Sequence, residues 1–108
     1  MCHCLDCQRR TGSVFGVQAR FADDQITVVA ADTLSHFTRT GDTGGLVTTR
    51  FCSNCATSVF WQVDKLPGFT MVGVGCFADP QFGAPVMSVY EDRRHPWTRQ
   101  PPEMECWD

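Results

Sequence analysis

Three cysteines near the beginning of the chain, at positions 2, 4 and 7, follow a C-x-C-x-x-C spacing, and this spacing most constrains the fold. Thiolates are preferred ligands of zinc, and short spacings bring several of them together with little loss of chain entropy. Two further cysteines, Cys52 and Cys55, have the C-x-x-C spacing of half a zinc knuckle. We therefore expect zinc at Cys2, Cys4 and Cys7, and a second zinc site at Cys52 and Cys55.

The chain has 108 residues, which we expect to form a single domain spanning residues 1–108. It has no apolar stretch long enough to span a bilayer and no basic segment followed by an apolar run, so we expect a cytoplasmic protein. In that reducing compartment, seven cysteines in clustered spacings favour metal binding or catalysis over disulfides. Because a domain of this size is stable by only about 5–15 kcal/mol, bound zinc could decide whether it folds.

The formal net charge is −3, and the basic residues are scattered along the chain. Neutralisation of phosphates by clustered basic side chains dominates affinity for nucleic acids, and no such cluster is present in the sequence. We therefore expect no nucleic-acid partner, and the lack of a long apolar stretch predicts no membrane association. The sequence does not indicate an oligomeric state.

Apolar and polar residues alternate along most of the chain, with the period of a half-buried β-strand. Near the first motif, for example, Val17 and Phe21 lie on one face of an expected strand, while Gln18 and Arg20 lie on the other. The pattern predicts strands in residues 13–22, 34–40, 46–51, 59–63, 69–77 and 85–90. No stretch predicts a long amphipathic helix, and the proline-containing residues 93–108 are expected to be extended and irregular. The expected fold class is all-β.

The first cysteine cluster predicts a compact ligand set. In extended chain Cys2 and Cys4 leave the same face while His3 points away, and Cys7 can return from a turn to complete a triangle of sulfurs. Three thiolates from this segment fill three of the four coordination positions of zinc and leave the fourth unfilled. Either that position stays open to water or substrate, as in catalytic zinc sites, or a distant cysteine closes it, as in structural sites.

The second pair, Cys52 and Cys55, lacks two ligands for a four-cysteine site. The remaining cysteines are Cys76 and Cys106. Cys76 lies within an apolar run, where we expect a small buried side chain of a strand, and Cys106 lies near the end of the sequence. Local spacing therefore does not complete this site, which suggests that ligands are missing upstream.

Residues 2–15 (CHCLDCQRRTGSVF) resemble the signature of the glutathione-dependent formaldehyde-activating enzyme family, which also includes centromere protein V. Residues 51–55 (FCSNC), followed by the expected strand at 58–61, are similar to the second cysteine pair of that family. Residues 89–97 (VYEDRRHPW) resemble its closing segment. The resemblance covers essentially the whole chain.

The resemblance implies a β-tent fold of short antiparallel sheets with two zinc sites. Cys2, Cys4 and Cys7 would hold a catalytic zinc, and Cys52 and Cys55 would hold a structural zinc together with an upstream C-x-C pair. This sequence begins inside the first motif, so we expect a domain that is N-terminally truncated relative to the family. Either Met1 is an internal residue of a longer chain, or the second site is completed differently.

The activity implied by the resemblance is the formation of S-(hydroxymethyl)glutathione from glutathione and formaldehyde by a zinc-dependent carbon–sulfur lyase-type enzyme. Zinc with an open position can deprotonate the glutathione thiol, which then adds to a small carbonyl. The alternative is a zinc-stabilised module that binds a thiol or a partner without turnover, because fold and metal ligands can persist while function changes.

The residues that directly follow the first motif are candidates for binding the substrate. The amides and hydroxyls of Thr11, Gly12 and Ser13 could hold the tripeptide, and Arg9 or Arg10 could face a glutathione carboxylate. The alternative for the two arginines is a solvated surface position. The three histidines are expected at the surface or rim rather than as ligands: His3, His36 and His95.

Overall fold

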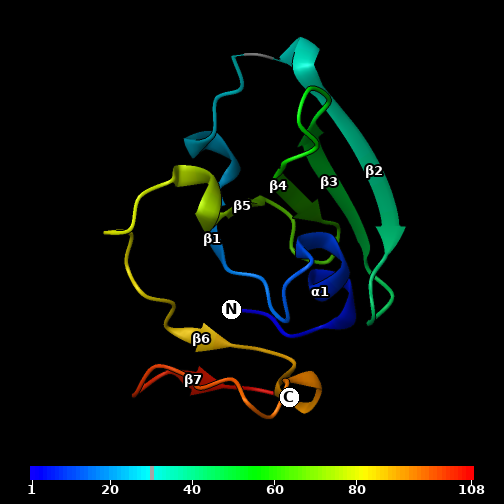
Figure 1. The fold of residues 1–108 in the computed structure, drawn as a ribbon. Helices are drawn as coiled ribbons and strands as arrows, with labels where there is room; N and C mark the ends of the chain where they lie inside the picture. The colour runs from blue at the N-terminus through cyan, green and yellow to red at the C-terminus, as the bar shows by residue number, and fades with distance from the viewer. Residues whose placement is uncertain (30) are drawn as a thin grey trace.

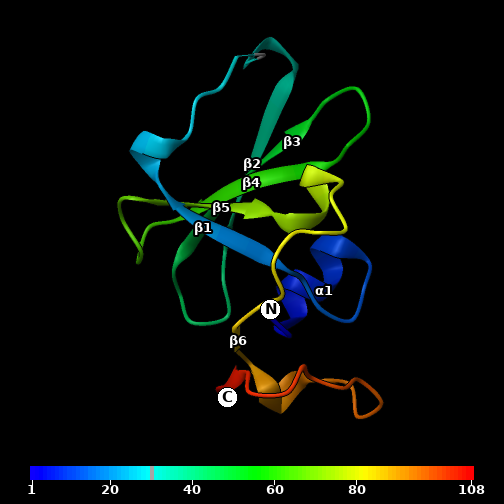
Figure 2. The same cartoon turned by 90° about the vertical axis from the view of Figure 1, so that its left-hand side faces the viewer.

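The computed structural model of the chain describes residues 1–29 and 31–108. Its main element is a five-stranded antiparallel sheet with the strand order β1-β5-β4-β3-β2 (Figures 1 and 2). The strands are β1 (Gln18–Ala22), β2 (Leu34–Thr40), β3 (Leu46–Cys52), β4 (Ser58–Val63) and β5 (Phe69–Gly73). This architecture confirms the all-β class expected from the sequence.

The remaining elements are short. They are the helix α1 (Leu5–Thr11), the parallel strand pair β6 (Met87–Ser88) and β7 (Glu105–Cys106), and the 3₁₀ helices η1 (Asp23–Gln25), η2 (Ala31–Thr33), η3 (Val74–Phe77) and η4 (Glu91–Arg93). Figures 1 and 2 both place the N-terminal segment and α1 between the main sheet and the C-terminal segment that carries β6 and β7. No helix in the described part of the chain is long and apolar enough to cross a membrane.

The two faces of the main sheet have different side chains because residues alternate along each strand. On one face, the neighbours Trp61 and Met71 are 5% and 6% exposed, and they form the buried centre of the sheet. On the opposite face, Thr48 and Gln62 are also paired neighbours, but they are only half-buried and exposed, respectively. The face that carries Trp61 is therefore the inner face.

Three expected strands are shorter than the alternation suggests, and in the third, residues 85–90, only β6 forms. β1 begins at Gln18 because residues 12–16 form the return from α1, and the run after Met71 leaves the sheet at Gly73. Residues 74–77 continue as η3, in which Cys76 is exposed and its sulfur lies 3.4 Å from the carbonyl of Ser58. The prediction of a buried strand position for Cys76 is therefore wrong, because glycines on either side of Val74 lack the side chains that would hold a strand in the sheet.

A buried polar cluster joins the N-terminal motif to the C-terminal segment. His3 is fully buried, so the expectation of a surface or rim position is wrong for this residue. The side-chain nitrogen of Gln100 lies 3.0 Å from His3 Nε2 and 3.0 Å from Ser88 Oγ, and it donates to Glu91. Arg94 completes the cluster, with Nε 2.7 Å from Glu91 Oε2. Buried polar groups need such partners, which is why this segment packs under the motif.

Gln8 makes a second connection between the same two segments. Its side-chain nitrogen donates to the carbonyls of His3 at 2.9 Å and Arg93 at 3.2 Å, and its oxygen lies 3.2 Å from His95 Nε2. One side chain of α1 therefore satisfies two backbone acceptors separated by almost the whole sequence.

We expect the Glu91 cluster to make stability depend on acid pH. Burial opposes ionisation of Glu91, but hydrogen bonds from Ser88 and Gln100 and the charges of His3 and Arg94 hold the pKa of this carboxyl below its ordinary value. Such a group stabilises the fold above the unfolded-state pKa of about 4.3, and this stabilisation is lost as pH falls through the folded-state pKa.

Glu91→Gln should therefore lower the free energy of unfolding at pH 7 by about 1–3 kcal/mol and flatten its decrease below about pH 5. Urea unfolding of wild type and variant at several pH values measures this difference. Glu105→Gln, at an exposed carboxylate on β7, is the control and should leave the pH dependence unchanged. If the free energy of unfolding of Glu91→Gln and of wild type fell equally below about pH 5, the prediction would be contradicted.

Candidate metal centre and its cleft

The sulfurs of Cys2, Cys4 and Cys7 lie within 4.8 Å of one another. All three residues are buried and form a single packed cluster, against which Val89 and Tyr90 lie. In the described part of the chain, this is the one group of three or more cysteine, histidine or acidic side chains placed close enough to hold a metal.

Helix α1 sets the spacing of Cys4 and Cys7. Cys4 is the N-cap residue, and its sulfur accepts a hydrogen bond from the amide of Cys7 at 3.3 Å. The helix ends at Gly12, whose left-handed φ of 70° suits glycine. Asp6 in the first turn and basic residues in the last turn complement the helix dipole. A cap and one helical turn therefore bring the two sulfurs to the same side.

Backbone pairing on two sides fixes Cys2. Its amide donates to the carbonyl of Gly16 at 2.8 Å, and the amide of Gly16 donates back at 2.9 Å. The segment of Val89 pairs on the other side, with the His3 amide donating to Val89 at 3.1 Å. Cys2 is thus held between the return from α1 and the C-terminal segment.

The crowding of three thiols makes their ionisation interdependent. Hydrogen bonds from Cys2 and Cys4, aided by the neighbouring charge of Arg10, lower the pKa of Cys7 to about 3. Hydrogen bonds with Cys4 and Cys7, together with burial, raise the pKa of Cys2. The hydrogen bond with Cys2 opposes a rise at Cys4, but the contact with Cys7 and burial raise the pKa of Cys4 overall. One thiolate therefore forms readily, whereas three negative charges in this space require a cation.

The residues present fit a zinc ion. Tetrahedral zinc with sulfur ligands at about 2.3 Å places pairs of sulfurs about 3.8 Å apart, within the spacing seen here. Buried thiolates are also the soft donors that zinc prefers over the hard cations magnesium and calcium. The cluster offers three ligands, and the other cysteines of the described chain lie outside it.

The cluster opens into a cleft of about 680 Å³ along the inner face of the main sheet. Trp61 and Met71 form part of its wall, and the guanidinium of Arg10 stacks on the Trp61 ring at 3.7 Å. The same guanidinium lies 3.9 Å from the sulfur of Cys7. A Cβ on Gly16 would lie 2.8 Å from Arg10 Nη2, so glycine at this position leaves room for the arginine.

The substrate-binding residues expected from the sequence occupy different places. Arg10 lines the cleft, whereas Arg9 is exposed and lies 3.7 Å from Asp6. The Thr11 hydroxyl donates to the carbonyl of Cys7 at 2.8 Å and accepts from the Ser13 amide at 3.0 Å. Thr11, the cap residue Gly12 and Ser13 are exposed and complete the end of α1 outside the lining of the cleft.

Cys52 and Cys55 lie at the tight turn between β3 and β4. The Cys52 amide donates to the carbonyl of Thr57 at 2.9 Å, and the Ala56 amide donates to the carbonyl of Cys52 at 2.7 Å. Cys52 is half-buried and Cys55 is exposed, and a hydrogen bond with Thr57 lowers the pKa of Cys55. Zinc binding by this pair stays a prediction.

Sequence reasoning missed the cleft-facing side of β1. The alternation correctly separates Gln18 and Arg20 from their apolar neighbours, but such a polar face normally meets solvent. Here both residues line the cleft. Asp6 also lines the cleft, where it forms an ion pair with Arg39. The pattern could reveal the two faces of β1 but not which face the first motif covers.

The glutathione-dependent formaldehyde-activating enzyme family model matches residues 1–93, which include all five cysteines expected to bind metal. No curated protein matches the chain.

We expect the cluster to bind one zinc ion and to release about two protons at neutral pH, because two of its three thiols must lose their protons. Cys7→Ser should weaken zinc binding at least about tenfold, since it removes the most acidic thiol. Competition with a chromophoric chelator measures affinity, and a weakly buffered titration measures proton release. Cys106→Ser is the matched control. Equal affinity of Cys7→Ser and wild type would place the metal elsewhere.

Proposed function

The chain belongs to the glutathione-dependent formaldehyde-activating enzyme family, and from this premise we propose that it is a zinc-dependent carbon–sulfur lyase-type enzyme. The proposed reaction forms S-(hydroxymethyl)glutathione from glutathione and formaldehyde, or acts on a related thiol adduct. The supporting observation is the cluster of Cys2, Cys4 and Cys7 in the wall of a cleft of about 680 Å³. Sites that bind small molecules commonly measure about 300–1,000 Å³.

The reaction requires a thiolate at one end of this cleft. A carbon–sulfur bond forms as the π bond of the carbonyl breaks, and the thiol proton ends on the former carbonyl oxygen. We assign Cys2, Cys4 and Cys7 to hold zinc. When bound there, zinc would supply a Lewis acid that lowers the pKa of a substrate thiol.

Arg10 is the member of the Arg9–Ser13 segment that we assign to a glutathione carboxylate. Its guanidinium has no carboxylate partner in the described part of the chain, and stacking on Trp61 fixes its plane. Arginine donors arranged in this way bind a carboxylate through charge-assisted hydrogen bonds. Thr11, Gly12 and Ser13 support this role by closing the end of α1. Buried Trp61 and Met71 exclude water from the adjoining wall.

The proposed setting of this reaction is the cytoplasm, where glutathione and protein thiols are kept reduced. A reduced cluster is required because a disulfide between two of its cysteines would remove two metal ligands. No nucleic acid or membrane takes part in the proposed reaction.

The zinc-loaded protein should accelerate addition of glutathione to formaldehyde above the uncatalysed rate at matched concentrations. Cys4→Ser should reduce this acceleration at least about tenfold, while circular dichroism shows that the strands remain, because β1–β5 satisfy their own hydrogen bonds. The adduct can be followed by proton NMR, with Cys76→Ser as the control. Tight binding of glutathione without acceleration would identify a binding module instead, and full activity of Cys4→Ser would contradict the assignment of the cluster.

A further inference from the structure

Strand β2 forms an open edge of the main sheet. It pairs with β3 on one side, and no described element of the chain pairs with its other side (Figure 1). Such an edge exposes a row of unpaired N–H and C=O groups, which proteins usually protect with prolines, lysines, bulges or very short strands. β2 is seven residues long, contains no proline, lysine or acidic residue, and pairs with β3 in a continuous register. The edge is therefore open to a further strand.

The hairpin between β2 and β3 shows which backbone groups of β2 are free. The Gly41 amide donates to the carbonyl of Gly45 at 2.7 Å, so Gly45 faces β2. The carbonyl of Leu46, one residue later, accepts from the Asp64 amide at 3.0 Å and so faces β4. Because this direction alternates along an antiparallel strand, every second residue of β2 directs its N–H and C=O groups away from β3. These residues are Leu34, His36, Thr38 and Thr40.

A second copy of β2 can satisfy all of these groups. Two antiparallel copies use every one of them only in the register that is symmetric about Phe37. His36 then lies opposite Thr38 of the second copy, and Leu34 lies opposite Thr40. Phe37 lies opposite itself at a position without backbone hydrogen bonds, where facing side chains come closest.

The side chains of β2 suit this register. Phe37 lies on the inner face of the sheet and is 63% exposed, so two facing rings would shield each other from water. Arg39, the permanently charged residue of β2, lies opposite Ser35 of the second copy and pairs with Asp6 of its own chain. Like charges therefore do not face each other across the contact, where they would oppose pairing.

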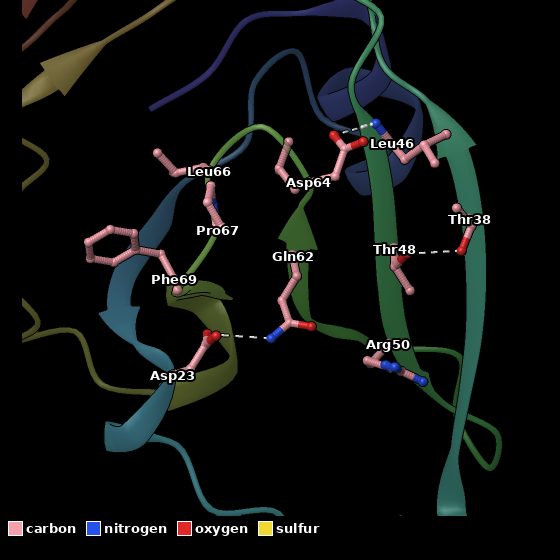
Figure 3. Close-up of a pocket in the computed structure, with 12 residues that line it drawn as sticks. Asp23, Thr38, Leu46, Thr48, Arg50, Gln62, Asp64, Leu66, Pro67 and Phe69 are labelled. Atoms are coloured by element: carbon pink, nitrogen blue, oxygen red, sulfur yellow. Dashed lines mark hydrogen bonds between the residues drawn. The ribbon is translucent and has the colours of Figure 1, made fainter.

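The outer face of β2 leaves the edge accessible as well. Figure 3 shows Thr38 beside a groove of about 380 Å³ on this face. The Thr38 hydroxyl lies 2.9 Å from that of Thr48 on β3, so it points across the sheet and away from the free edge. His36, two residues earlier on the same face, is exposed.

We propose that two copies of this chain associate through β2 and form one continuous antiparallel sheet across a two-fold axis at Phe37. The partner is a second copy because the register that satisfies the backbone also pairs Phe37 with itself and keeps the Arg39 charges apart. Each copy uses its own β2 edge in this contact, so the association closes at a dimer. The surface is independent of the proposed reaction.

Sedimentation equilibrium of the zinc-loaded chain tests this proposal, with a reductant present because several cysteines are exposed. Wild type should form a dimer as its concentration rises. Phe37→Lys places like charges opposite each other and should weaken dimerisation at least about tenfold. Trp97→Lys is the matched control, because Trp97 is similarly exposed, at 66%, and lies outside the sheet. It should dimerise as wild type does.

A backbone variant tests the edge itself. His36→Pro removes one free N–H but no hydrogen bond between β2 and β3, so it should also weaken dimerisation at least about tenfold. His36→Ala keeps this N–H and should dimerise as wild type does. Circular dichroism checks that each variant remains folded.

Amide hydrogen exchange locates the contact in wild type and needs no variant. The amides of Leu34, His36, Thr38 and Thr40 should become protected as the protein dimerises. A wild-type chain that stays monomeric at millimolar concentration would overturn the proposal. A dimer in which these amides exchange as fast as in the monomer, or one that Phe37→Lys leaves unchanged, would overturn it too, because the contact would then lie on another surface.

Discussion

The packing of three thiols against one another is the interaction on which the arrangement of the site depends. Besides Cys2, Cys4 and Cys7, the buried apolar side chains among the described residues are Trp61 and Met71. The accessible surface is 7078 Å², compared with about 6,000 Å² expected for a folded monomer of this mass. A domain with so small an apolar core would gain stability from a metal, and here the candidate metal site and the core are the same place.

The polar cluster around Glu91 holds the C-terminal segment against the N-terminal cysteine motif. It fixes His3 between two cysteines of the motif, and Gln8 ties α1 to the backbone of Arg93. Because these contacts satisfy buried groups, moving the C-terminal segment would leave His3 and Glu91 without partners. The ligand geometry therefore depends on residues nearly a hundred positions away in the sequence.

The distance between partners explains which features could be predicted from the sequence. The cluster of Cys2, Cys4 and Cys7 was predictable because the three cysteines are close in the sequence. The all-β class was predictable because the alternation of apolar and polar residues is a short-range pattern. The burial of His3 was not predictable, since its partner Gln100 lies 97 residues away in the sequence. Helix α1 was missed because seven residues are too few for a helical period, and cysteine is an unusual N-cap residue.

Different elements supply the cysteine cluster and the wall of the cleft beside it. The candidate metal ligands come from the first motif, whereas Gln18 and Arg20, which also line the cleft, come from β1. The ligands are constrained by the geometry of zinc, but the side chains of β1 that face the cleft are constrained only by the strand that carries them. Substitutions on β1 can therefore alter the wall of the cleft while the cysteine cluster remains intact. For this reason the cysteine motif indicates the chemistry proposed for the site, whereas the wall of the cleft, which includes β1, would decide which substrates fit.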